Sequence, residues 1–257
     1  MRFFRSLALL LLILALTACT PPPSTAPTEP PPSPAPSASP TIEQGHFSAD
    51  AVTLSYLLYL PATVTPDTPM LVYLHGGSGK GEEPNALLAL NGFPKFLSEG
   101  KLGTPEALIL IPQLPRQYTG WESVGDALIA LIQQLTAEHT PQANHIALTG
   151  HSMGGTGVWR LAIAFPETFA RIAPLSGSVR LTDSNINALA QMPIRTFVGE
   201  ADTVVDPQST INFINALKKQ NANASLTVLK NATHESVPAT VYLDKDLALL
   251  NWLLGAS

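Results

Sequence analysis

The chain has 257 residues, of which 45% are apolar and 13% charged, and this composition can fill the core of one α/β domain, which excludes a wholly disordered chain. Its single cysteine excludes an intramolecular disulfide and the cysteine-rich zinc modules. The net charge of −5, with no cluster of lysine or arginine, argues against nucleic acid as a partner.

Residues 1–18 have the pattern of a secretory signal peptide. Arg2 and Arg5 precede an apolar run, residues 7–16, that is shorter than a membrane span requires. The run ends in Leu-Thr-Ala-Cys, which resembles the lipobox of bacterial lipoproteins, where the cysteine is acylated and becomes the first residue of the mature chain. The only cysteine, Cys19, stands at that position, so we expect a lipid anchor there and an extracytoplasmic protein held at the cell membrane. An ordinary signal peptide with a chance cysteine is the alternative.

Residues 19–40 are expected to form a tether. They contain ten of the 24 prolines, among serine, threonine and alanine, and one charged residue, Glu29. This composition cannot bury a core and favours polyproline II, in which residues 20–40 span at most roughly 65 Å at about 3.1 Å per residue. The folded domain is therefore predicted to cover residues 41–257.

Apolar runs alternate with amphipathic stretches throughout this domain. Near-continuous apolar runs, typical of strands buried on both faces, occur at Val52–Leu60, Met70–Leu74, 107–111, 145–148, 172–175, 194–198 and 226–229. Apolar residues spaced three and four apart predict helices over 124–135 and 211–217. This alternation predicts an α/β fold, a mostly parallel twisted sheet with helices on both faces, with residues 41–60 as an antiparallel hairpin at one edge. Ligands of such sheets bind beyond the carboxyl ends of the strands.

The segment after residues 70–74 reads His75-Gly-Gly77-Ser-Gly. Unhindered backbone N–H groups at this position form part of an oxyanion hole in nucleophile-elbow enzymes, and we expect Gly77 and Met153 to supply the two donors. A phosphate-binding loop is excluded because Lys80 is followed by glycine instead of serine or threonine. Tyr118 and Trp121 lie in loop 113–123. We expect them either to form a wall of the substrate-binding site or to pack against the turn that contains Ser152.

The pattern Gly-His-Ser152-Met-Gly follows a short apolar run and precedes a helical stretch at 156–165. In this strand–turn–helix context the pattern predicts a nucleophile elbow, a sharp turn that projects the serine hydroxyl above the sheet edge. The start of the helix also stabilises developing negative charge. Ser152 is therefore the predicted nucleophile.

A serine nucleophile requires a base, and an elbow enzyme has the order serine, acid, histidine along the chain. His234 is the one histidine after Ser152, and it follows the run 226–229. Asp202 is the preferred acid because it lies in a turn at the carboxyl end of the run 194–198. The other acidic residues in the interval are a helix-capping Asp206 and three further candidates, Glu167, Asp183 and Glu200.

Taken together, these segments resemble the α/β-hydrolase superfamily, and in particular its secreted esterases of the polyhydroxyalkanoate-depolymerase-like and predicted-peptidase-like group. The resemblance runs from about residue 54 to 254 and rests on the His-Gly-Gly segment, the Gly-His-Ser-Met-Gly elbow and Gly-Glu-Ala-Asp at 199–202. It implies a triad of Ser152, Asp202 and His234. A tryptophan often follows the base in depolymerase-like members, whereas Glu235 follows it here, which places polymer specificity in doubt.

The predicted function is hydrolysis of carboxylic esters, small or surface-bound, through an acyl-enzyme, without cofactor or metal. Residues 177–192 are too few for a multi-helix cap, so we expect an open site with a minimal lid. A peptidase or acyltransferase of the same fold, and a non-catalytic surface-binding lipoprotein, are the alternatives.

Overall fold

The computed structural model describes residues 39–139, 146–220 and 223–255. The predicted signal peptide, the lipidation site at Cys19 and nearly all of the tether lie outside the described residues. None of the helices in the described ranges is both long and apolar enough to span a bilayer.

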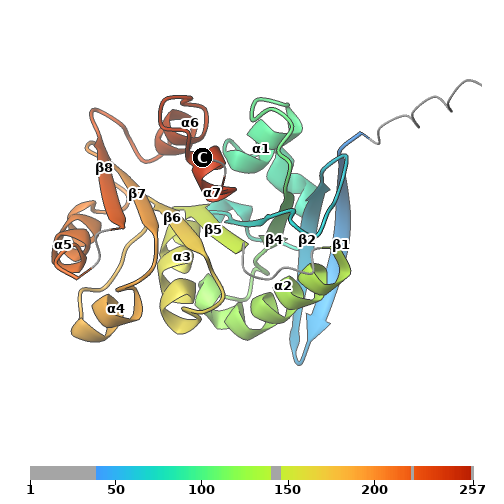
Figure 1. The fold of residues 1–257 in the computed structure, drawn as a ribbon, viewed down its shortest axis with the longest axis horizontal. Helices are drawn as coiled ribbons and strands as arrows, with labels where there is room; N and C mark the ends of the chain where they lie inside the picture. Colours follow the sequence, from blue (N-terminus) through green and yellow to red (C-terminus); the bar gives the residue numbers. More distant parts are fainter. Residues whose placement is uncertain (1–38, 140–145, 221–222, 256–257) are drawn as a thin grey trace, which may run out of the picture. The chain divides into compact units, whose positions relative to one another are not determined.

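The described part of the chain contains one sheet of eight strands in the order β1-β2-β4-β3-β5-β6-β7-β8 (Figure 1). The strands are β1 (Thr41–Ala49), β2 (Val52–Leu60), β3 (Met70–Leu74), β4 (Leu108–Gln113), β5 (Ile146–His151), β6 (Arg171–Leu175), β7 (Ile194–Gly199) and β8 (Ala224–Leu229). The hairpin β1–β2 joins the sheet antiparallel to β4, and the other neighbouring pairs are parallel. The predicted fold class and edge hairpin are confirmed.

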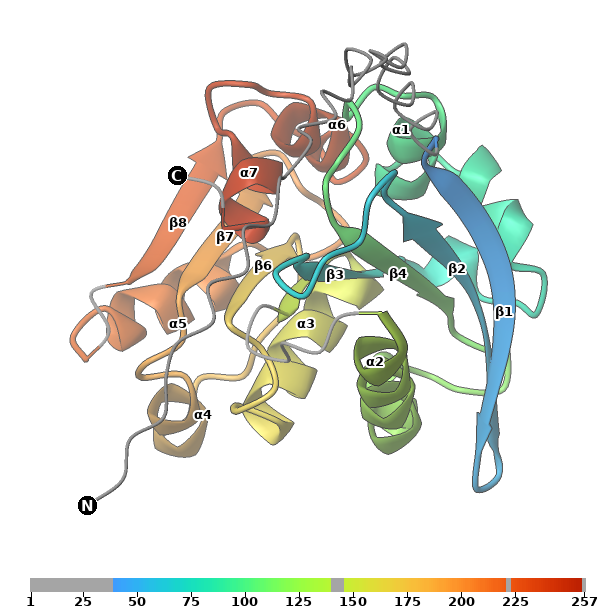
Figure 2. The same ribbon diagram turned by 45° about the vertical axis from the view of Figure 1, so that its right-hand side comes forward.

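Helices cover both faces of this sheet (Figure 2). One face packs against α2 (Gly125–His139), α3 (Met153–Ala164), α4 (Asp183–Ala188) and α5 (Gln208–Leu217). The other face packs against the 3₁₀ helix η2 (Pro84–Ala89) and against α1 (Phe93–Ser98), α6 (Val237–Tyr242) and α7 (Leu249–Leu253). Two further 3₁₀ turns, η1 (Gly77–Gly79) and η3 (Trp121–Val124), follow β3 and β4.

The two-residue period of a strand divides the apolar side chains between two cores. In β3 and β4, Val72 and Leu110 belong to the core under α2 and α3, while Leu71 and Ile109 belong to the core under α1 and α6. These four side chains are all fully buried. The continuous apolar runs in the sequence are therefore strands that are covered on both sides.

The predicted helices at 124–135 and 211–217 correspond to α2 and α5. Before α5, the Asp206 carboxylate accepts a hydrogen bond from the Gln208 N–H at 2.9 Å, which confirms Asp206 as a cap. At the start of α4, the hydroxyl of Thr182 accepts the Asn185 N–H, so Thr182 is the cap and Asp183 is the first residue of the helix. Helices α1, α4, α6 and α7 were not predicted because five or six residues are too few to show a helical period.

Candidate active site

The elbow between β5 and α3 holds Ser152 in a backbone conformation that is unusual for a residue with a side chain. Its φ is 60° and its ψ is −121°. The Ser152 N–H donates to the Leu175 carbonyl at 3.0 Å, and this bond ties the turn to the end of β6. Strain of this kind persists only where the surroundings fix the residue.

Two glycines of the elbow allow the backbone to pass close to β3. A Cβ on Gly150 would lie 2.6 Å from the Leu74 carbonyl oxygen, and a Cβ on Gly154 would overlap the same oxygen. Any larger residue would push β5 and α3 away from β3, which leads directly into the His-Gly-Gly segment. The motif therefore requires glycine at positions 150 and 154, because the backbone passes so close to the end of β3 there.

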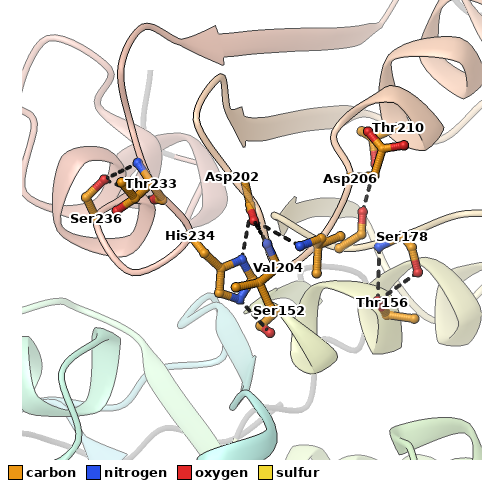
Figure 3. A network of polar contacts seen from close by, with 12 residues as sticks. Ser152, Thr156, Ser178, Asp202, Val204, Asp206, Thr210, Thr233, His234 and Ser236 are labelled. Atoms are coloured by element: carbon orange, nitrogen blue, oxygen red, sulfur yellow. Dashed lines mark hydrogen bonds and ion pairs between the residues drawn. The ribbon is translucent and has the colours of Figure 1, made fainter.

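His234 lies in the loop between β8 and α6, within reach of the elbow (Figure 3). The Ser152 hydroxyl donates to His234 Nε2 at 2.8 Å, and His234 Nδ1 donates to Asp202 Oδ2 at 2.8 Å. An ionised carboxylate only accepts hydrogen bonds, so the proton of the neutral imidazole is on Nδ1 and Nε2 is the acceptor. This geometry is the one in which a histidine activates a serine hydroxyl.

The Asp202 carboxylate is fixed by the turn that follows β7. Its Oδ1 accepts the backbone N–H groups of Val204 and Val205, both at 2.9 Å. Burial alone would raise the pKa of Asp202, but the hydrogen bonds from these N–H groups and from His234 outweigh it, so the pKa lies below its usual value. Asp202 is thus ionised and oriented toward the imidazole.

The other acidic candidates do not reach His234. The Glu200 carboxylate accepts the Asn231 N–H at 3.0 Å. Glu167 is exposed in the turn between α3 and β6, and Asp206 and Asp183 are at the starts of α5 and α4. The structure therefore brings together Ser152, Asp202 and His234, the three residues selected from the sequence.

His151 packs against the base from inside the elbow. Its ring centroid is 4.5 Å from that of His234. Burial, reinforced by the charge of His234, lowers the pKa of His151 to about 4, and a hydrogen bond to the His234 carbonyl opposes this shift. His151 is therefore neutral near pH 7 and supports the loop that carries His234.

The His-Gly-Gly segment is braced by residues that follow β4. The Leu114 N–H donates to His75 Nε2 at 3.0 Å, while His75 Nδ1 donates to the Gly76 carbonyl at 2.6 Å. The indole of Trp121 donates to the His75 carbonyl at 3.1 Å. Burial lowers the pKa of His75 to about 4, so the ring is neutral and can keep both of its hydrogen bonds.

The structure does not place Trp121 or Tyr118, the predicted substrate-binding residues, at the cavity beside Ser152. Trp121 is fully buried in the core, and Tyr118 packs against that core. Neither lines the cavity at Ser152, because the loop after β4 turns beneath the His-Gly-Gly segment. The alternative, packing near the elbow, describes Trp121, whose ring also contacts Gly157 of α3.

A cavity of about 290 Å³ opens beside Ser152, and the segment between β3 and α1 forms its outer wall. Leu87, Leu90, Gly92 and Pro94 line this wall, and Tyr73 of β3 lines the cavity as well. None of these residues was predicted from the sequence to line the site. Residues 87–94 belong to the connection that leaves the carboxyl end of β3, which is the end of the sheet where the site was predicted. That position is the signal that would have identified them.

Gly77 and Met153, the predicted oxyanion donors, are the first residues of η1 and α3. The first N–H groups of a helix have no acceptor within that helix, so they are available to other acceptors. Gly77 lines the cavity beside Ser152. In the described residues, no three histidine, cysteine or acidic side chains are grouped so as to hold a metal ion.

Comparison with solved structures supports the fold class. A thermostable esterase superposes with a TM-score of 0.67 at 24% identity, over 83% of this chain and 62% of that one. A feruloyl esterase module from Clostridium thermocellum, in complex with sinapinate, superposes with a TM-score of 0.62 at 17% identity, over 82% and 88% of the two chains. The chain has the α/β-hydrolase fold.

The sequence of the chain also matches known proteins directly. The model of the dienelactone hydrolase family matches residues 111–237, which include the elbow, Asp202 and His234. NocK of Nocardia uniformis subsp. tsuyamanensis, provisionally named as an esterase, is 25% identical over 206 residues, or 71% of this chain. The chain spans 57% of the length of NocK.

Two of the buried histidines, His75 and His151, make stability dependent on pH. Unfolded histidine has a pKa of about 6.5, so between pH 6.5 and 4 the unfolded chain binds protons that folded His75 and His151 exclude. The free energy of unfolding is expected to fall across this window, by on the order of 1–3 kcal/mol for each histidine. Urea midpoints of the wild type and of His151→Gln at pH 7.5, 6.5, 5.5 and 4.5 measure the slope. The variant should have the shallower slope, and equal slopes would contradict the assignment of His151.

Proposed function

We propose that the chain is a serine esterase that cleaves carboxylic esters through an acyl-enzyme on Ser152. The observation that carries this proposal is the pair of 2.8 Å contacts that link the Ser152 hydroxyl, the His234 imidazole and the Asp202 carboxylate. The esterase names of NocK and of the structural neighbours agree with it.

In the proposed mechanism, His234 accepts the proton as the Ser152 hydroxyl attacks the ester carbonyl carbon. Asp202 keeps the imidazole in the required tautomer and stabilises its charged form. The N–H groups of Gly77 and Met153 bind the oxyanion of the tetrahedral intermediate. His234 then protonates the departing alcohol, and water activated by the same imidazole releases the acid.

Replacement of Ser152 by alanine is expected to abolish covalent labelling by a fluorophosphonate and to remove ester hydrolysis, because no nucleophile remains at the elbow. Asp202→Asn, which keeps the size of the side chain, is expected to lower kcat by about 10⁴-fold, because the amide favours the wrong imidazole tautomer. Labelling and hydrolysis of p-nitrophenyl acetate measure both effects. A Ser152→Ala protein that still labels would contradict the assignment of the nucleophile.

The same purified protein separates the esterase from its alternatives. An esterase hydrolyses p-nitrophenyl acetate and butyrate faster than a peptide p-nitroanilide. The reverse order would favour a peptidase, and product formation that requires an added alcohol would favour an acyltransferase. Wild-type protein that does not label at all would favour the non-catalytic lipoprotein.

Trp121→Phe tests the brace of the proposed oxyanion segment. Phenylalanine keeps a ring in the core but removes the hydrogen bond to the His75 carbonyl. We expect a loss of stability of about 1–3 kcal/mol and a fall in kcat of about tenfold, with little change in KM, because the oxyanion donors contribute mainly in the transition state. A matched variant at another core aromatic, Phe213→Leu, should lose stability without the fall in kcat. Equal kcat in Trp121→Phe and wild type would contradict the brace.

We further propose that Cys19 carries a lipid anchor and that the enzyme acts at the outer side of a cell membrane. The support is the signal-like sequence of residues 1–18 and the position of the only cysteine. Cys19→Ser is expected to move the protein from the membrane fraction to the soluble fraction of the producing cell, without loss of esterase activity. Membrane association that survives the substitution would contradict the anchor.

A further inference from the structure

The side chains around the cavity at Ser152 divide into an apolar wall and a polar remainder. Leu87, Leu90, Pro94 and Val204 supply apolar surface. The polar side chains, apart from the serine and histidines of the elbow and its supports, are those of Tyr73, Ser78, Asn91 and Glu235. Within the described lining, Glu235 is thus the side chain that has a full charge at neutral pH.

The surroundings leave this charge uncompensated. Glu235 is exposed, follows His234 directly, and has no ion-pair partner in the described ranges. Basic side chains occur in the same loop, at Lys230, and in the loops after β3 and β4, at Lys80 and Arg116, but none of the three lines the cavity. Arg116 is itself 4.0 Å from the Glu82 carboxylate. A substrate that enters the cavity therefore meets a single negative charge.

We propose that Glu235 determines specificity by charge: its carboxylate favours esters with a positively charged alcohol or acyl group and disfavours esters that contain a carboxylate. This inference rests on the proposed esterase function and names its substrate class. The volume of about 290 Å³ is at the lower end of ligand pockets, so we infer short groups in place of long acyl chains. Because the carboxylate is exposed, water and salt weaken its field, and we expect a preference of a few fold.

Three thioacetates that differ mainly in charge test this inference, all followed by release of a thiol. They are acetylthiocholine, its neutral isostere S-(3,3-dimethylbutyl) thioacetate, and the anionic 3-(acetylthio)propanoate. In Glu235→Gln, the ratio of kcat/KM between the cationic and the anionic compound is expected to fall about three- to tenfold at low ionic strength. The neutral compound should be unaffected within about twofold, and 0.5 M NaCl should reduce the ratio of the wild type.

Glu167→Gln is the matched control. It removes the same charge from an exposed turn before β6. This turn lies at the amino-terminal ends of the parallel strands, whereas the site lies at their carboxyl ends. This variant should keep the wild-type ratio. An equal fall in both variants would assign the effect to net charge and overturn the proposal, as would an unchanged ratio in Glu235→Gln.

Failure of this inference is distinguishable from failure of the esterase proposal. Labelling of Ser152 by a fluorophosphonate without charge discrimination, or without turnover of any of the three compounds, overturns the role of Glu235 alone. Absence of both labelling and turnover in the wild type overturns the esterase function and this inference with it.

Discussion

The site depends on how closely three backbone segments approach one another around Ser152. The elbow passes within contact of the end of β3, which is possible because Gly150 and Gly154 have no side chain, and it is tied to the end of β6 through the Ser152 N–H. The strained conformation of Ser152 is the result of this packing. The same contact brings the start of α3 next to the His-Gly-Gly segment, so one packing constraint positions both the hydroxyl and the N–H groups around it.

Asp202 and His234 are held together by backbone contacts as well as by their own hydrogen bond. The loops after β7 and β8 are joined where the Ala201 N–H donates to the Ala232 carbonyl at 3.0 Å, one residue before Asp202 and two residues before His234. The Asn231 N–H and the Glu200 carboxylate add a second link. Because both strands are parallel neighbours, these loops leave the sheet at the same edge. The imidazole therefore has little freedom to turn away from the carboxylate.

The sequence was sufficient to predict the strands, the edge hairpin and the three side chains that meet at the site, since each depends on a local pattern. Apolar runs mark the strands, the Gly-x-Ser-x-Gly pattern marks the elbow, and chain order left His234 as the one histidine after Ser152. Asp202 was preferred over Glu200 because it lies in a turn. The structure gives the physical reason: two backbone N–H groups of that turn donate hydrogen bonds to the Asp202 carboxylate and orient it.

The features that the sequence did not predict depend on contacts between distant segments. Trp121 has the composition of a binding-site aromatic, and only the three-dimensional path of the loop after β4 shows that its indole bonds to the His75 carbonyl. The cavity wall at 87–94 has no motif, because apolar side chains at a rim are of the same types as those in a core. Helices α6 and α7 are too short for their period to show.

The loops after β3 and β4 both adjoin the site but differ in structural role: the first lines the cavity, and the second supports the His-Gly-Gly segment. Gln113 and Trp121 donate to the backbone carbonyls of Gly79 and His75, and the Leu114 N–H donates to the His75 ring, so a change in the length or sequence of this segment is transmitted to the loop that carries the proposed oxyanion donor. The wall at 87–94 lines the cavity mostly with apolar side chains, and Asn91 is its polar member. Evolution or engineering can therefore reshape the wall to admit new acyl groups while the chemical machinery stays intact, whereas the buried brace tolerates little variation.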